Sequence, residues 1–205
     1  MNRPGLANVL TSSRFVLAPL FAIVFHLVAG FESFHVVGIS LLWIIFVLIE
    51  LSDVLDGAVA RRSATVSDLG KLLDPFADVV SKITYFACLL VAGIVPLWFL
   101  LVVLYREFGI ILVRMILYRN GTALGAHTAG KLKTWFYAVT SGVGLFFLSL
   151  ETLAGRPVMA LTRSLDPWQS TVMIALLVIT AGLCVGSFIQ YLVLFARARK
   201  PGPRA

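Results

Sequence analysis

The chain is organised around residues 51–82, which read LSDVLDGAVARRSATVSDLGKLLDPFADVVSK. Apolar runs long enough to cross a bilayer flank this stretch on both sides. Carboxylates at a membrane boundary are costly, so their presence there is itself a sign of function. The stretch contains five of the ten acidic residues of the protein, namely Asp53, Asp56, Asp68, Asp74 and Asp78.

The spacing of four of these carboxylates predicts a metal site. Asp53 and Asp56 are three residues apart and Asp74 and Asp78 are four apart, so on helices each pair lies on one face. Two such helices facing each other would present four carboxylates to one point, where they repel unless cations lie between them. Hard divalent cations such as Mg²⁺ or Mn²⁺ suit a set of oxygen ligands.

Small residues and arginines accompany the carboxylates. Gly57 and Gly70 leave room for a ligand to approach the backbone, and Ala60 is also small. Arg61 and Arg62 place positive charge beside the carboxylates, and a phosphate-bearing ligand would use both the metals and the arginines. The other reading is a solvated acidic loop with charge-paired arginines, which the regular spacing disfavours.

The pattern D-x-x-D-G-x-x-A-R from Asp53 to Arg61, followed by G-x-x-x-D-x-x-x-D from Gly70 to Asp78, resembles the signature of the CDP-alcohol phosphatidyltransferases. The resemblance implies that a CDP-linked lipid, CDP-diacylglycerol, donates its phosphatidyl group to an alcohol and releases CMP. It implies two divalent cations, Mg²⁺ or Mn²⁺, held by Asp53, Asp56, Asp74 and Asp78. It further implies that Asp78 is the catalytic base and that the CDP moiety is lined by Gly57, Ala60, Arg61 and Gly70.

Three further stretches resemble the bacterial branch of this family that makes phosphatidylglycerophosphate. They are LDPFAD at residues 73–78, R-E followed by six residues and R from Arg106 to Arg114, and GKLKT at residues 130–134. The resemblance implies glycerol 3-phosphate as the acceptor, a homodimer, and an acceptor phosphate site formed by Arg106, Arg114, Lys131 and Lys133. One position departs from the pattern, because many such synthases have lysine directly after the last aspartate, whereas this chain has Val79 and its next lysine is Lys82.

Two of these assignments have structural alternatives. Lys131 and Lys133 would also serve as ordinary anchors on the cytoplasmic side of the membrane. Arg106 would lie well inside its span, where an unpaired charge is costly, and could pair with Glu107 or with a motif aspartate instead.

The composition predicts one polytopic, all-α membrane domain covering residues 1–205. The chain is 60% hydrophobic and 13% charged, whereas soluble domains are about a quarter charged. We expect a short interfacial helix within residues 1–13 and six transmembrane helices. They are expected at residues 14–29, 35–51 (continuing as helix to about 62), 70–92, 97–117, 131–150 and 169–195, with a tight turn at residues 93–96.

The charge distribution predicts the orientation. Lysines and arginines gather on the side that holds both termini and the acidic motif, which places these in the cytoplasm and the protein in the bacterial inner membrane. The net charge of +7 is attributed to cytoplasmic loops and anionic lipids, with no nucleic acid partner. Arg14 opens the first span, either as a snorkelling interfacial residue or as an ion-pair partner of the site.

Two alternative functions stay open at this point. One is a transferase of the same family with another acceptor, such as inositol phosphate, serine or another alcohol. The other is a cation transporter with a carboxylate cluster inside the membrane. The surrounding arginines disfavour the transporter, because they would repel a cation and attract phosphate.

Overall fold

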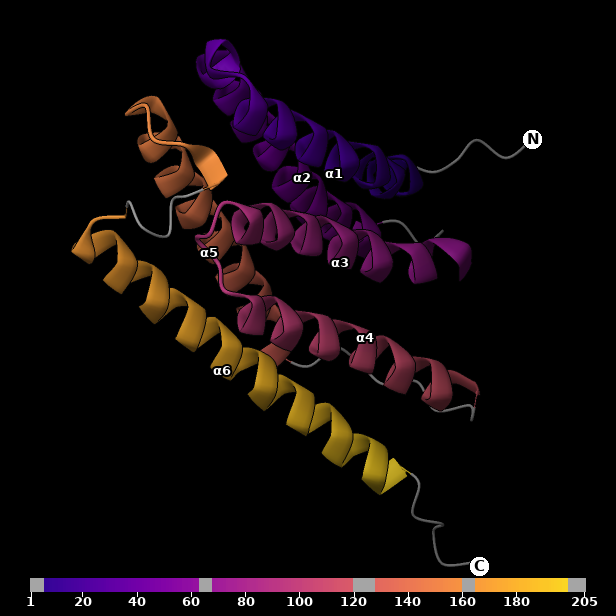
Figure 1. Ribbon diagram of the computed structural model, residues 1–205. Helices are drawn as coiled ribbons and strands as arrows, with labels where there is room; N and C mark the ends of the chain where they lie inside the picture. The colour runs from indigo at the N-terminus through magenta and orange to yellow at the C-terminus, as the bar shows by residue number, and fades with distance from the viewer. Residues whose placement is uncertain (1–5, 63–67, 120–127, 160–164, 199–205) are drawn as a thin grey trace, which may run out of the picture.

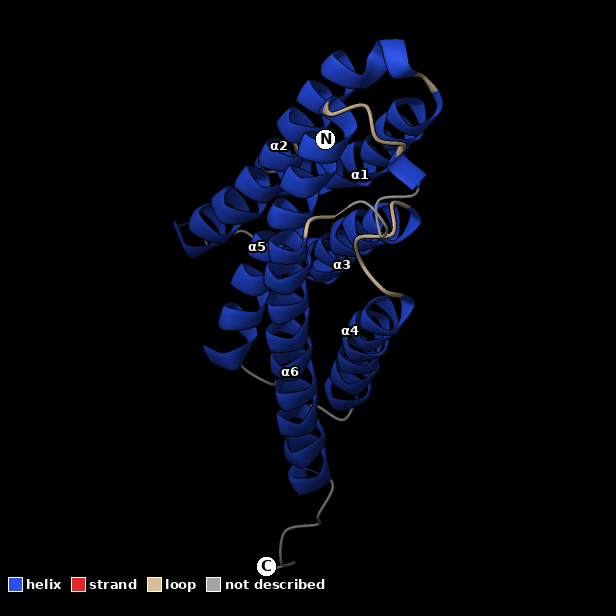
Figure 2. Cartoon of the chain, turned by 60° about the vertical axis from the view of Figure 1, so that its left-hand side comes forward, coloured by secondary structure: helices blue, strands red, loops and turns tan. Residues whose placement is uncertain are grey.

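The computed structural model describes residues 6–62, 68–119, 128–159 and 165–198, with side chains described at 13–55, 76–117, 132–159 and 165–196. In these ranges the regular elements are helices (Figures 1 and 2). They are α1 (Leu6–Gly30), the short 3₁₀ helix η1 (Glu32–Phe34), α2 (His35–Arg62), α3 (Asp68–Val91), α4 (Leu97–Arg119), α5 (Thr128–Leu153) and α6 (Pro167–Ala198). The all-α prediction is therefore confirmed for the described part of the chain.

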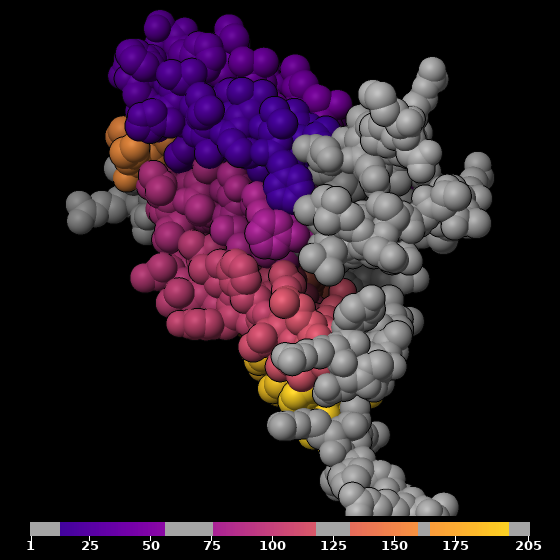
Figure 3. Space-filling model, turned by 90° about the vertical axis from the view of Figure 1, so that its right-hand side faces the viewer, coloured from indigo at the N-terminus to yellow at the C-terminus, as the bar shows by residue number. Residues whose placement is uncertain are grey.

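The long helices form one bundle in which successive helices reverse direction. The start of α1, the end of α2, the start of α3 and the ends of α4 and α6 lie toward one end of it (Figure 1). Helix α1 packs against α2 and α3, while α6 packs against α4 and α5. Helix α3 also contacts α4 and α5, so it joins the two halves. Seen from the end where α3 begins, the surfaces of α1, α3 and α4 follow one another (Figure 3).

The predicted turn at residues 93–96 is confirmed. Gly93 has a φ of 79°, a conformation that glycine adopts without steric cost. Its N–H donates to the carbonyl of Leu90 at 2.9 Å, and the N–H of Ile94 donates to that of Leu89 at 2.9 Å. This pair of bonds is the Schellman motif that ends a helix, and Pro96 directly precedes the start of α4.

Four helices are long and apolar enough to cross a membrane, among the residues that the structure describes. The qualifying segments are Ser13–Gly30, Glu32–Leu55, Leu132–Leu153 and Pro167–Ala196. They support a membrane protein, whereas the count of six spans stays a prediction. Helix α1 is continuous from Leu6, so the expected interfacial segment is helical from there on, and its placement at the membrane surface also stays a prediction.

Aromatic rings fill the centre of the bundle. The Tyr85 ring lies 5.0 Å from that of Phe21 and 5.1 Å from that of Phe46, measured between centroids. The Phe86 ring lies 5.0 Å from Phe99 and 5.7 Å from Tyr137. These contacts connect α1 to α5 through α3 and hold the helices that carry the site.

Helices α1 and α2 approach closely at Gly38. A Cβ atom there would lie 2.3 Å from Cγ2 of Val28 and 2.8 Å from Cδ1 of Phe34. Because the Val28 side chain is fully buried, it has little room to move. We expect Gly38→Ala to destabilise the protein by about 1–3 kcal/mol, measured as a lower unfolding temperature in detergent.

Gly182→Ala in α6 is the matched control, because no described atom lies within 4 Å of the added methyl group. This variant should unfold at or slightly above the temperature of the unchanged protein. Equal unfolding temperatures for Gly38→Ala and Gly182→Ala would contradict the close packing of α1 on α2.

Candidate active site

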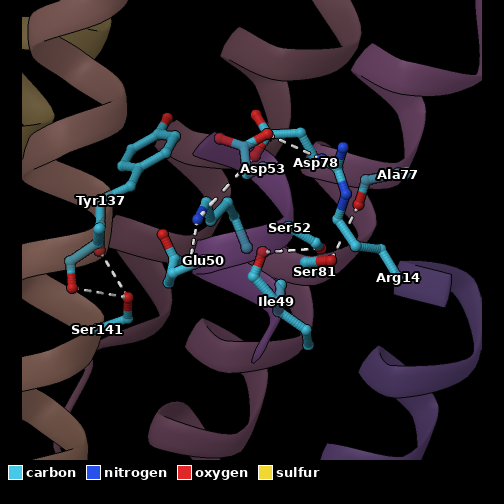
Figure 4. A network of polar contacts seen from close by, with 12 residues as sticks. Arg14, Ile49, Glu50, Ser52, Asp53, Ala77, Asp78, Ser81, Tyr137 and Ser141 are labelled. Atoms are coloured by element: carbon cyan, nitrogen blue, oxygen red, sulfur yellow. Dashed lines mark hydrogen bonds and ion pairs between the residues drawn. The ribbon is translucent and has the colours of Figure 1, made fainter. Parts of the chain in front are cut away.

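Two of the predicted carboxylates lie together in the half of the bundle that holds the end of α2 and the start of α3. Asp53 comes from α2 and Asp78 from α3, and their side chains lie close together (Figure 4). Both are partly accessible, with side-chain exposures of 30% and 24%. Two consecutive helices thus bring carboxylate oxygens to one open point.

Arg14 reaches this point from α1. Its Nη1 donates to Oδ1 of Asp53 at 2.9 Å, and its side chain is only 1% exposed. Of the two interpretations of Arg14, the ion pair with the site is therefore the one observed. A buried guanidinium beside a carboxylate offsets part of the desolvation cost of both groups.

A second ion pair lies one helical turn away from Asp53 and Asp78, further from the end of α2 and the start of α3. The Nζ atom of Lys82 donates to Oε1 of Glu50 and lies 4.0 Å from Oδ1 of Asp78. Lys82 is buried, whereas Glu50 keeps a side-chain exposure of 21%. Arg14 thus contacts Asp53 and Lys82 lies beside Asp78, so each carboxylate has a cation near it.

A third polar cluster surrounds Glu107 in α4, whose side chain is 8% exposed. Lys133 of α5 donates to its Oε1 at 2.5 Å, and Tyr137 donates to the same oxygen at 2.9 Å. Nη1 of Arg106 contacts both carboxylate oxygens, at 2.9 and 2.8 Å, while its Nε donates to Oγ of Ser187 in α6 at 3.1 Å. Two cations from different helices thus share one buried carboxylate.

This third cluster carries a net positive charge, because the two cations of Arg106 and Lys133 share the single carboxylate of Glu107. Arg114 lies apart from it, donating through Nη2 to the Tyr191 hydroxyl at 2.8 Å with its guanidinium over that ring.

The remaining predicted site residues lie in helices, but their own side chains are outside the described residues. They are Asp56, Gly57, Ala60 and Arg61 in α2, Gly70 and Asp74 in α3, and Lys131 in α5. Among the side chains that the structure does describe, no three histidines, cysteines or acidic residues form a group that could hold a metal ion. The donor chemistry of Asp53 and Asp78 nevertheless fits a hard divalent cation, because both offer carboxylate oxygens only.

Sequence reasoning predicted Arg14, Asp53, Asp78 and the pairing alternative for Arg106, but missed four contributing residues. Neither Lys82 nor Glu50 was predicted as a site residue, although their spacing of four and three from Asp78 and Asp53 places them on the site faces. Tyr137 and Ser187 have no comparable signal, because their roles depend on how α5 and α6 pack against α4.

The family model described as CDP-alcohol phosphatidyltransferase matches residues 5–196. The chain is 42% identical over 110 residues to the CDP-diacylglycerol–glycerol-3-phosphate 3-phosphatidyltransferase of Treponema pallidum, covering 54% of this chain and 50% of that protein. It is 32% identical over 138 residues to the protein of the same name from Bacillus subtilis, covering 64% of this chain and 71% of the relative.

A third relative has a different name. The chain is 37% identical over 116 residues to the cardiolipin synthase (CMP-forming) of Streptomyces coelicolor, covering 57% of this chain and 53% of that protein. The aligned segment thus spans about half the length of the Treponema and Streptomyces relatives. The family model, by contrast, extends over nearly the whole chain and includes all the helices that bring Arg14, Asp53, Asp78 and Glu107 to the site. The chain therefore belongs to the CDP-alcohol phosphatidyltransferase family.

Proposed function

We propose that this protein transfers the phosphatidyl group of CDP-diacylglycerol to glycerol 3-phosphate, giving phosphatidylglycerophosphate and CMP. The observation that carries the proposal is the meeting of Asp53 and Asp78 at one partly exposed point, in a chain of this family. The names of the Treponema and Bacillus relatives support glycerol 3-phosphate as the acceptor.

Asp53, Asp56, Asp74 and Asp78 would hold two divalent cations, Mg²⁺ or Mn²⁺. Such ions supply Lewis-acid polarisation of the attacked phosphoryl group and charge neutralisation of the departing phosphate. Asp78 would accept the proton of the acceptor hydroxyl. The hydroxyl oxygen would bond to phosphorus while the bond from phosphorus to CMP breaks. Gly57, Ala60, Arg61 and Gly70 would line the CDP moiety.

The acceptor phosphate would be bound by Arg106, Arg114, Lys131 and Lys133. The net positive charge around Glu107 supports this, because a phosphate dianion needs fixed cationic donors near the carboxylates. Arg106 and Lys133 come from different helices, so together they could contact a phosphate from two sides. The structural alternative is that Glu107 merely neutralises these two cations.

We further propose that the domain works as a homodimer in the bacterial inner membrane, with the site and both termini on the cytoplasmic side. Helix α1 begins and α6 ends toward the same end of the bundle where α2 ends and α3 begins (Figure 1). Asp53 and Asp78 lie in the halves of α2 and α3 nearer to that end, as this orientation requires. The acyl chains of the donor could then stay in lipid while its CDP group reaches the site.

An acceptor screen with purified protein tests the function. CDP-diacylglycerol would be offered with glycerol 3-phosphate, inositol phosphate, serine or phosphatidylglycerol, and CMP and the lipid product would be identified by mass spectrometry. We expect the fastest CMP release with glycerol 3-phosphate. Phosphatidylglycerol is included because of the Streptomyces relative, and a preference for it would replace the proposed acceptor. Cation flux in proteoliposomes without CMP release would support the transporter instead.

A further inference from the structure

Three layers of contacts connect α2 to α3 below the open end of the site. The top layer is the Asp53 and Asp78 pair, and one turn deeper Glu50 is bonded to Lys82. One turn deeper again, the rings of Phe46 and Tyr85 lie 5.1 Å apart. On each helix the three residues are spaced by three or four positions, so they line one face. The Glu50–Lys82 pair therefore forms the floor beneath the carboxylates.

The ammonium group of Lys82 is confined to this floor. Lys82 is 1% exposed, its Nζ lies 5.7 Å from the centroid of the Tyr85 ring, and among the described residues it forms ion pairs with Glu50 and Asp78. A buried ammonium needs a partner charge, and Glu50 supplies the nearer one. The bond to Glu50 thus keeps Lys82 from pairing fully with Asp78, whose nearest oxygen lies at 4.0 Å.

The position directly after the last motif aspartate carries no charge in this chain. Val79, which stands where many such synthases have lysine, is 4% exposed and belongs to the buried core. Lys82 lies one turn further along α3 and extends its charge back to the carboxylate of Asp78. The chain thus keeps a cation beside its last motif aspartate, but at a position where a second acidic residue shares it.

We infer that Lys82 and Glu50 are positioning residues that set how strongly the motif carboxylates bind their divalent cations. Lys82 adds a fixed positive charge beneath Asp53 and Asp78 and so weakens cation binding, while Glu50 partly cancels that charge and so strengthens it. This inference rests on the metal site of the proposed function. An ion pair that only held α2 against α3 would have no such opposed effects.

Opposite shifts in Mn²⁺ affinity test the inference. Mn²⁺ would be titrated into the purified full-length protein without substrates, and the free ion followed by electron paramagnetic resonance. A unit charge about one helical turn from a divalent cation changes its affinity by about tenfold even when screened as in water. We therefore expect Lys82→Met to bind Mn²⁺ about tenfold more tightly and Glu50→Gln about tenfold more weakly.

A matched control removes a cation from an ion pair at the other end of the bundle. Arg156→Met breaks the pair with Glu151 and should leave Mn²⁺ affinity unchanged. If Lys82→Met does not fold, Lys82→Gln takes its place, because it keeps a donor toward Glu50 and loses the charge. Weaker binding in both the Lys82 and the Glu50 variants, or no shift in either, would overturn the inference.

The result is separable from that of the acceptor screen. Opposed shifts in Mn²⁺ affinity without transfer to glycerol 3-phosphate would support the inference and remove the proposed function. Transfer to glycerol 3-phosphate with parallel or absent shifts would do the reverse. An unchanged protein that binds no Mn²⁺ would overturn the inference whatever its activity.

Discussion

Asp53→Asn is expected to lower CMP release by more than about a hundredfold, because loss of a group that only supports a metal ligand already costs about 10–100-fold. The change replaces a charged oxygen by a neutral amide in the proposed metal site. The fold should survive, since the amide oxygen can still accept the hydrogen bond that Nη1 of Arg14 donates at 2.9 Å. Steady-state CMP release measures the loss, and circular dichroism with size-exclusion chromatography in detergent checks the fold.

Asp166→Asn provides the control with the same chemical change. Asp166 directly precedes α6, at the bundle end opposite to the site, and asparagine caps helices as well as aspartate does. The activity of Asp166→Asn should equal that of the unchanged protein.

Excess chelator should stop CMP release by the unchanged protein, and added Mg²⁺ or Mn²⁺ should restore it. Undiminished turnover by Asp53→Asn, or robust turnover in excess chelator, would rule out a metal-dependent site at Asp53.

The helices could be predicted from sequence because their signals are local. The bounds expected for α2, from His35 to about Arg62, agree with the structure, since the apolar run and the carboxylate spacing share one helical period. The ends of α5 were less well predicted. The span was expected to end at residue 150, but α5 continues through Glu151, where Gln169 and Arg156 donate to its carboxylate. Hydrogen-bond partners from later segments stabilise this polar helix end, and they cannot be predicted from the local sequence.

The part of the candidate site that lies on α2 and α3 could be predicted from the sequence. Asp53 and Asp78 follow from spacing alone, because α2 and α3 are consecutive. The Glu107 cluster could not be predicted from spacing. Lys133 and Tyr137 are 26 and 30 residues away from Glu107 in the sequence, and Ser187 comes from α6. Whether Arg106 pairs with Glu107 or with a motif aspartate is decided by the packing of α4 against α5 and α6. Long-range packing of this kind has no local sequence signature.

Arg106→Ala is expected to raise the KM for glycerol 3-phosphate by about thirtyfold or more, with little change in the KM for CDP-diacylglycerol. The estimate follows from the cost of losing one charged contact, on the order of 2–5 kcal/mol. Arg106 is 6% exposed and shares Glu107 with Lys133, so its removal also lowers the net positive charge that the cluster offers to an acceptor phosphate. Initial rates with each substrate varied in turn provide both KM values.

Because Arg106 contacts Glu107, the main alternative is a purely structural role for Arg106. Removing one partner of a buried ion pair can cost about 3–5 kcal/mol of stability, so Arg106→Ala alone could lose activity by unfolding. The double variant Arg106→Met with Glu107→Gln removes both charges of the pair and keeps similar side-chain volumes. If Arg106 only balances Glu107, this double variant should recover both stability and the original KM for glycerol 3-phosphate. If Arg106 binds the acceptor phosphate, stability should return while that KM stays high. Recovery of the KM, or an equal rise for both substrates in Arg106→Ala, would make Arg106 a structural residue and leave Lys133 as the cation of this cluster that could recognise glycerol 3-phosphate.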